Sequence, residues 1–173
     1  MSNAVRHRPI WVLAVVSLSV VVLDQLSKAW AVSALRPRLL PGGDGPIEIL
    51  GSLLKLTYTQ NTGAAFSIGT GSTWIFSLIA IGVAIFIIRS AKDLGSIAWA
   101  VGLGGLLGGL LGNLIDRLTR YPSPGQGYVV DWIQLPNFPV FNVADMSITF
   151  SAILMVFLAL RGIDYKGTVS TTS

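Results

Sequence analysis

The chain has 173 residues, of which 52% are hydrophobic and 12% are charged, and its formal net charge is +4. Soluble domains carry roughly 25% charged residues. This composition therefore leaves too few polar side chains to cover a water-exposed surface and favours a membrane protein. Cysteine is absent, which excludes disulfides, thiolate metal sites and cysteine nucleophiles. The basic residues are scattered, so no nucleic-acid-binding surface is predicted.

Four apolar stretches reach or approach the length needed to cross about 30 Å of hydrocarbon as helices. They cover residues 10–34, 72–89, 97–117 and 143–161. For the first stretch a signal peptide is the alternative, because Arg6 and Arg8 precede it; its length and the internal Asp24 and Lys28 favour a retained span. The sequence thus predicts one integral membrane domain, residues 1–173.

Four spans place both termini on the same side of the membrane. Lysine and arginine divide evenly between the two sides, and discounting Lys28 and Arg117, which sit beside acids, favours cytoplasmic termini. Most acids fall on the opposite side. Loops 36–71 and 119–141 are therefore predicted to be extracytoplasmic, and the alternating pattern at 54–59 predicts a short strand or hairpin.

Two of the spans carry polar residues that need an explanation. Asp24 and Lys28 are spaced i, i+4, which suits either a structural ion pair or an acid that braces a polar site. Asn113 and Asp116 share one helix face after a glycine ridge, where they could support a polar site. The alternative is a simple ion pair between Asp116 and Arg120. The ridge itself (Gly104, Gly108, Gly112) predicts close helix packing or dimerisation.

Two further aspartates flank the last span. Asn142 is a good helix N-cap, and Asp145 would then be an acid favoured by the first helical turn, which is the structural alternative to a catalytic role. Asp131 stands among large apolar residues, where an unpartnered carboxylate is costly. Both aspartates are therefore candidates for chemistry.

Elimination narrows that chemistry. The single histidine, His7, lies at the N-terminus, which excludes a Ser-His-Asp triad and an HExxH metal site. A serine–lysine dyad with Lys28 or Lys55 stays open. Carboxylates are the remaining candidates, because two of them that share one proton can hydrolyse a peptide bond without a metal or cofactor, as in aspartic peptidases.

The chain resembles lipoprotein signal peptidase, also called signal peptidase II, over about residues 21–160. The resemblance rests on five blocks in the same order along a four-span frame. These blocks are Asp24–Lys28, Asn61–Phe66, Gly112–Arg117, Val129–Asp131 and Phe141–Asp145. Two features depart from the family: the interval from Asp131 to Asp145 is short, and Met146 and Ser151 stand near positions where members often carry serine and glycine.

The resemblance implies an all-α membrane fold of four transmembrane helices with a small extracytoplasmic β-sheet cradle. It implies an aspartic endopeptidase with catalytic Asp131 and Asp145 and with no cofactor or metal. The residues expected to bind substrate or support the pair are Asp24, Lys28, Asn61, Gly63, Asn113, Asp116, Arg117, Asn142 and Ala144.

The resemblance also implies a substrate and a location. The substrate is a diacylglyceryl-modified bacterial prolipoprotein, cut just before its lipidated cysteine. The enzyme is expected to be a monomer in the lipid of the bacterial cytoplasmic (inner) membrane, with its active site on the extracytoplasmic face and no nucleic-acid partner.

Two other functions fit parts of the sequence. A small proton-coupled transporter would explain carboxylates in a membrane, but it favours acids near the midplane of several helices. A scaffold that packs through the glycine ridge would explain that ridge, but it gives no reason for polar blocks to gather on one side.

Overall fold

The structure of the chain is a computed structural model that describes residues 3–63, 73–122 and 124–167. Four long helices and one small sheet dominate this part of the chain. The helices are α1 (Asn3–Ala34), α2 (Thr73–Ser90), α3 (Ile97–Thr119) and α4 (Val143–Leu160). The strands are β1 (Ile47–Glu48), β2 (Lys55–Asn61) and β3 (Val129–Gln134), and two short 3-10 helices are η1 (Pro37–Leu39) and η3 (Ala91–Asp93).

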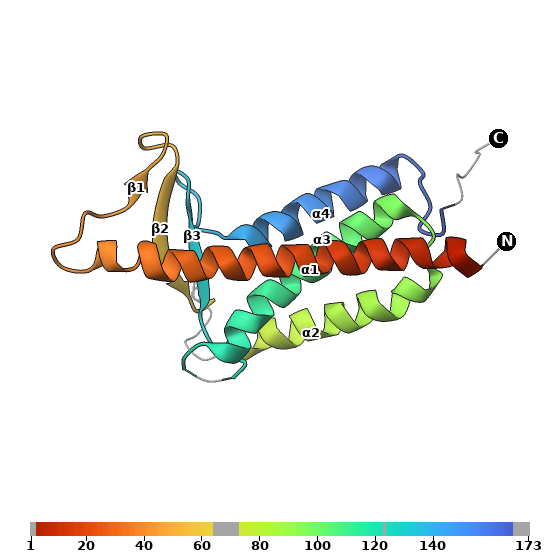
Figure 1. The fold of residues 1–173 in the computed structure, drawn as a ribbon, viewed down its shortest axis with the longest axis horizontal. Helices are drawn as coiled ribbons and strands as arrows, with labels where there is room; N and C mark the ends of the chain where they lie inside the picture. Colours follow the sequence, from red (N-terminus) through yellow and green to blue (C-terminus); the bar gives the residue numbers. More distant parts are fainter. Residues whose placement is uncertain (1–2, 64–72, 123, 168–173) are drawn as a thin grey trace.

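The helices form a bundle with the sheet at one end (Figure 1). α1 begins and α4 ends at the opposite end of the bundle. α3 is the central helix, because it packs against α1, α2 and α4. The last turns of α1 and α3 and the first turn of α4 therefore meet beside the sheet.

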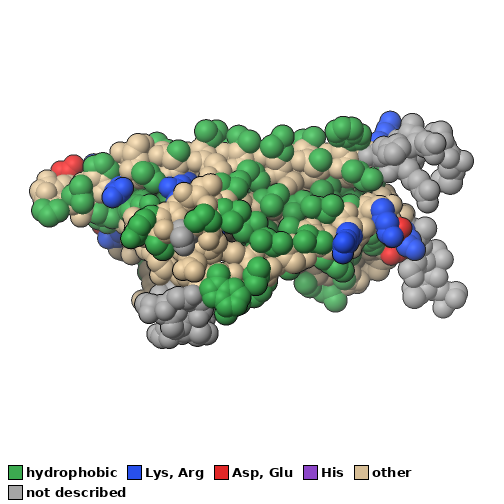
Figure 2. All heavy atoms as spheres, turned by 90° about the horizontal axis from the view of Figure 1, so that it is seen from below, with side chains coloured by type: hydrophobic (Ala, Val, Ile, Leu, Met, Phe, Trp, Pro, Cys, Tyr) green, Lys and Arg blue, Asp and Glu red, His purple; other side chains and the backbone are tan. Residues whose placement is uncertain are grey.

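All four helices are long and apolar enough to cross a membrane. Many of their large apolar side chains point outward; Phe86 is 70% exposed and Leu160 is 81% exposed. Such a surface is unfavourable in water but suits hydrocarbon. Figure 2 shows hydrophobic side chains over the middle of one face and charged side chains towards its two ends.

Glycines let α3 approach its neighbours closely. A methyl group on Gly108 would lie 2.7 Å from the backbone oxygen of Ser17 in α1, and one on Gly109 would lie 2.6 Å from the backbone oxygen of Ala144 in α4. Because helices in lipid associate by packing rather than by the hydrophobic effect, small residues at such contacts are the expected solution. The glycine ridge thus packs helices of one chain against each other.

The sheet is antiparallel with the strand order β1-β2-β3. Asn61 pairs with Val129, and Thr59 pairs with Asp131. Side chains two residues apart share one face of a strand, so Asn61 and Asp131 are diagonal neighbours on the same face. The sheet therefore brings two distant sequence blocks together.

The strand β3 was not predicted from its own residues. Val129, Val130 and Asp131 are consecutive and all buried, so the segment lacks the alternation that identifies a strand with one exposed face. Val130 packs with Ala31 of α1 and with Leu35, the residue that follows α1, in a small buried cluster. That contact fixes the end of α1 against the sheet.

The predicted fold class is confirmed: four membrane-spanning helices accompany a small antiparallel sheet. The predicted strand at 54–59 is confirmed as β2. Residue 72 of the predicted second span and Ala64–Phe66 of one sequence block lie outside the described residues. Of the two residues that depart from the family pattern, Met146 is exposed and Ser151 is buried.

The glycine contacts predict that Gly108→Ala destabilises the bundle. Overpacking costs about 1–3 kcal/mol, so we expect the thermal midpoint in detergent micelles to fall by several degrees. Gly82→Ala in α2 is the matched control, because no heavy atom lies within 4 Å of a methyl group there. Equal midpoints for the two variants would contradict this account of the α1–α3 contact.

Candidate active site

Asp131 is a buried carboxylate on β3, with only 1% of its surface exposed. Its Oδ2 accepts a hydrogen bond from Asn61 Nδ2 at 2.9 Å, and its Oδ1 accepts one from Asn142 Nδ2 at 2.6 Å. The carboxylate is therefore partnered on both oxygens, as a buried carboxylate must be. Asn61 comes from β2 and Asn142 from the start of α4, so three elements hold this one side chain.

Asp145 lies in the first turn of α4. Asn142 caps this helix: its side-chain oxygen accepts from the backbone nitrogen of Asp145 at 3.0 Å, and its own backbone nitrogen donates to Asp145 Oδ2 at 3.1 Å. This arrangement is a reciprocal capping box. Asn113 Nδ2 of α3 donates to the other oxygen of Asp145 at 2.8 Å. The helix-cap interpretation is thus structurally correct, and the same geometry turns Asp145 towards α3.

One residue touches both candidate aspartates. The side-chain amide of Asn142 donates to Asp131, and the backbone amide of Asn142 donates to Asp145. Asn142 is itself fully buried. The two carboxylates therefore lie on either side of one asparagine, although they are fourteen positions apart in the sequence.

A buried ion cluster holds the backbone next to both candidate aspartates. Lys28 Nζ lies 2.8 Å from Asp24 Oδ2 and 3.2 Å from Asp116 Oδ2, and all three side chains are at most 1% exposed. Asp24 Oδ1 accepts the backbone N–H of Ala144, and Asp116 Oδ2 accepts that of Val130. Each of these backbone groups immediately precedes a candidate aspartate.

Further contacts complete the cluster. Arg120 Nε donates to Asp116 Oδ1 at 2.8 Å, which is the alternative pairing considered from sequence. Gln25 Nε2 donates to Asp24 Oδ2 and to the backbone oxygen of Gly112. Gln25 was not among the predicted site residues, because its role depends on the approach of α1 to α3.

Arg117 and Gly63 lie at the margin of the site. The Arg117 guanidinium carbon lies 5.4 Å from the ring centre of Phe76, and its buried Nη1 has no hydrogen-bond partner among the described residues. Gly63 has a φ of +83°, and its backbone nitrogen donates to Asn61 Oδ1. That bond orients the Asn61 amide so that its nitrogen faces Asp131.

The environment changes the proton affinity of Asp131. The pKa of this carboxyl is raised from its ordinary 3.8 to about 6, because burial and, less strongly, the charge of Asp145 raise it more than the hydrogen bonds from Asn61 and Asn142 lower it. A carboxyl with a pKa near 6 exchanges its proton close to neutral pH. That property suits general acid–base chemistry.

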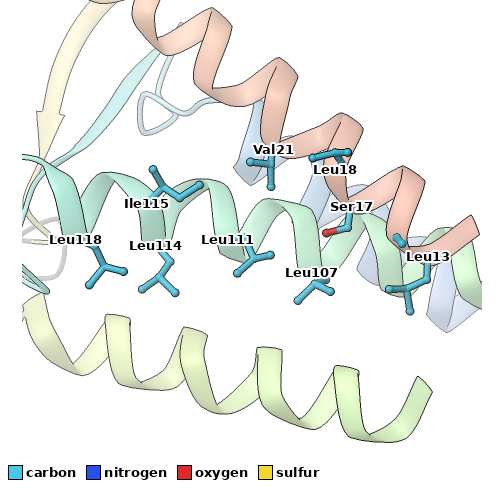
Figure 3. Close-up of a pocket in the computed structure, with 10 residues that line it drawn as sticks. Leu13, Ser17, Leu18, Val21, Leu107, Leu111, Leu114, Ile115 and Leu118 are labelled. Atoms are coloured by element: carbon cyan, nitrogen blue, oxygen red, sulfur yellow. The ribbon is translucent and has the colours of Figure 1, made fainter. Parts of the chain in front are cut away.

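Two cavities differ in the chemical character of their lining residues. The larger, of about 460 Å³, lies between α1 and α3 and is lined by leucines and other apolar side chains with Ser17 (Figure 3). It holds no carboxylate or amide. The smaller, of about 250 Å³, includes Asp131 and Asn61 together with Gln60, Pro139 and Val140, so it is the one beside the candidate chemistry.

The structure brings nearly all of the predicted site residues into one contact network. Its members are Asp24, Lys28, Asn61, Gly63, Asn113, Asp116, Asp131, Asn142, Ala144 and Asp145. Among the described residues Arg117 makes no side-chain hydrogen bond to this network, and it acts on Asp131, Asp145 and Asp116 through its charge. Within residues 3–63, 73–122 and 124–167, no three acidic or histidine side chains are grouped to hold a metal ion.

The four spans and the buried acid–amide network place the chain among multi-pass membrane enzymes. A solved bacterial membrane enzyme, determined by the in meso method at 1.9 Å resolution, matches it with a TM-score of 0.73 at 28% identity, over 86% of this chain and 92% of that one. A second, determined by the same method at 2.3 Å, matches with a TM-score of 0.70 at 27% identity, over 87% of this chain and 88% of that one.

The family follows from the sequence comparisons. Residues 16–161 match the family of signal peptidase (SPase) II. A lipoprotein signal peptidase of Leifsonia xyli subsp. xyli is 50% identical over 90% of this chain and 70% of that protein. One of Mycobacterium avium is 44% identical over 95% of this chain and 88% of that protein. The chain therefore belongs to the signal peptidase II family, and the resemblance noted from its five sequence blocks is confirmed.

The raised pKa of Asp131 predicts a pH-dependent stability. A carboxyl with a raised folded-state pKa stabilises the fold fully below its ordinary 3.8, and that contribution is lost as the pH rises through about 6. Asp131→Asn cannot ionise and lacks this loss. We therefore compare the thermal unfolding midpoints of Asp131→Asn and of wild type. The difference, variant minus wild type, is expected to increase between about pH 4 and about pH 7. A difference that does not vary with pH would count against the raised pKa.

Proposed function

We propose that the chain is an aspartic endopeptidase in which Asp131 and Asp145 are the catalytic pair. The observation that carries this proposal is Asn142, whose side-chain and backbone amides each donate to one of the two carboxylates. In this proposal the two carboxylates share one proton. Asp131 lines the cavity of about 250 Å³, whereas Asp24 and Asp116 of the ion cluster do not, so we place the reaction at Asp131, with Asp145 as its neighbour on the other side of Asn142.

The proposed reaction is hydrolysis by a directly activated water. The ionised carboxylate removes a proton from water while the protonated carboxyl donates a hydrogen bond to the scissile carbonyl oxygen. Water oxygen adds to the carbonyl carbon, the carbon–nitrogen bond breaks, and the departing amine takes up a proton. The products are a peptide carboxylate and a new amino terminus, and both aspartates return to their starting state.

The proposed substrate follows from the names of the relatives, which are lipoprotein signal peptidases. We assign to this chain the cleavage of diacylglyceryl-modified prolipoproteins just before the lipidated cysteine. The geometry supports a lipid-tethered substrate, because the cavity at Asp131 lies at the sheet end of the helices and includes the apolar Pro139 and Val140. A substrate held in the bilayer reaches such a site laterally.

The proposed location is the bacterial cytoplasmic membrane, with the sheet and the aspartate pair on the extracytoplasmic side. α1 begins and α4 ends at the end of the bundle away from the sheet, which places both termini in the cytoplasm in this orientation. A monomer is proposed to be sufficient for activity.

Asp131→Asn and Asp145→Asn are each expected to abolish cleavage. Either change prevents the pair from sharing a proton, and losses of about 1,000-fold or more in kcat are expected when an acid–base group is removed. The measurement is a gel-shift assay of a diacylglyceryl-modified prolipoprotein in mixed detergent–lipid micelles, with thermal midpoints recorded for every variant.

The matched control is Asp44→Asn. Asp44 lies shortly before the strand β1 in the sequence. Its side chain is 80% exposed, and among the described residues it pairs only with Arg38. This variant is expected to cleave like wild type. Cleavage by a folded Asp131→Asn or Asp145→Asn variant would remove that residue from the catalytic pair.

The proposed orientation is tested with single cysteines, because the natural chain has none. Asp44→Cys is expected to react with a membrane-impermeant maleimide in spheroplasts. Lys92→Cys, between α2 and α3, is expected to react only after the membrane is permeabilised. The reverse pattern would invert the proposed topology.

A further inference from the structure

The contacts of Lys28 exceed what charge balance requires. Its buried ammonium group lies near Asp24 and Asp116, and it also donates to Asn113 Oδ1 at 2.9 Å. An ammonium has three N–H donors and no acceptor. Two carboxylates already offer more negative charge than one ammonium can neutralise, so the third contact, to a neutral amide, satisfies the remaining buried N–H donor rather than charge balance.

That third contact fixes which way the Asn113 amide points. A side-chain amide has an oxygen on one side and an NH₂ group on the other, and its hydrogen-bond partners decide the orientation. Lys28 accepts no hydrogen bond, so it must face the amide oxygen. The Asn113 nitrogen then faces Asp145 Oδ1 at 2.8 Å. In the reverse orientation, oxygen would face carboxylate oxygen and NH₂ would face ammonium.

The same oxygen also orients the second amide of the site. Asn113 Oδ1 accepts a hydrogen bond from Asn142 Nδ2 at 3.1 Å, and this nitrogen donates to Asp131 Oδ1. The Asn142 oxygen is already occupied by the backbone nitrogen of Asp145. One amide oxygen, held by Lys28, therefore lies at the junction of the contacts to both aspartates.

We infer that Lys28 is a positioning residue for the aspartate pair, acting through Asn113 Oδ1 to keep amide N–H groups directed at both carboxylates. This inference rests on the proposed function, because it assigns Lys28 a task in the same peptidase site. Lys28 is fully buried and does not line the cavity at Asp131. Its loss should therefore lower kcat by loosening the carboxylates while leaving KM nearly unchanged.

The alternative is that Lys28 only neutralises buried acids. A charge-balanced double variant, Asp24→Asn with Lys28→Gln, separates the two roles, because it removes one negative and one positive charge together. The new glutamine can offer either end of its amide to Asn113, so the orientation is no longer enforced. We expect kcat to fall about 10- to 100-fold, with KM within about twofold of wild type. Wild-type kcat in the folded double variant would overturn the inference.

Arg38→Gln is the matched control. Arg38 pairs with Asp44 at 3.2 Å, and among the described residues it makes no hydrogen bond with Asn113 or Asn142. Its kcat is expected to stay at the wild-type value. A loss equal to that of the double variant would show that removing any ion-paired cation lowers kcat, which contradicts a specific role for Lys28.

A second variant keeps the test decisive if the double variant does not fold. Asn113→Asp retains an oxygen towards Lys28 but replaces the N–H donor to Asp145 with oxygen, so the same loss of kcat is expected and wild-type kcat would overturn the inference. Wild type and Asp145→Asn are assayed alongside these variants. If wild type cleaves, Asp145→Asn does not, and the double variant is fully active, the inference about Lys28 is refuted while the proposed function stands. If folded wild type does not cleave, the proposed function itself is refuted.

Discussion

A single buried ammonium group connects four of the elements that carry the site. Lys28 of α1 binds Asp24 on its own helix and Asp116 on α3, and these two acids hold the backbone N–H groups of Ala144 and Val130. Arg120 supplies a second positive charge, so the four charges of the cluster balance. An unpaired charge at this depth would be strongly destabilising. The cluster is therefore stable only when α1, α3, α4 and β3 are in place together.

The position of the cluster at the sheet end of the bundle determines what the site can do. Charges and amides are concentrated at the sheet end of the bundle, while the large cavity between α1 and α3 is apolar (Figure 3). A transporter relay would instead require polar groups along the path across the bilayer. At the sheet end, burial raises the pKa of Asp131 to about 6, which suits acid–base chemistry.

The sequence predicted the elements of this fold better than it predicted their contacts. Apolar length alone predicted the four spans, and i, i+4 spacing predicted the Asp24–Lys28 pair, because both signals are local. The contact of Lys28 with Asn113 joins residues 85 positions apart and depends on the glycines that let α1 and α3 approach. No local pattern encodes that approach. The strand β3 was missed for a related reason: its buried residues follow one another and resemble any short apolar run.

The most direct test of the aspartate pair is an experimental structure with a non-cleavable ligand. A diacylglyceryl-modified peptide in which a hydroxyl-bearing carbon replaces the scissile carbonyl mimics the tetrahedral intermediate, and such analogues bind tightly when a site is complementary to the transition state. The account predicts that this hydroxyl lies within hydrogen-bonding distance of both Asp131 and Asp145. A tightly bound, competitive ligand whose hydroxyl contacts neither carboxylate would contradict it.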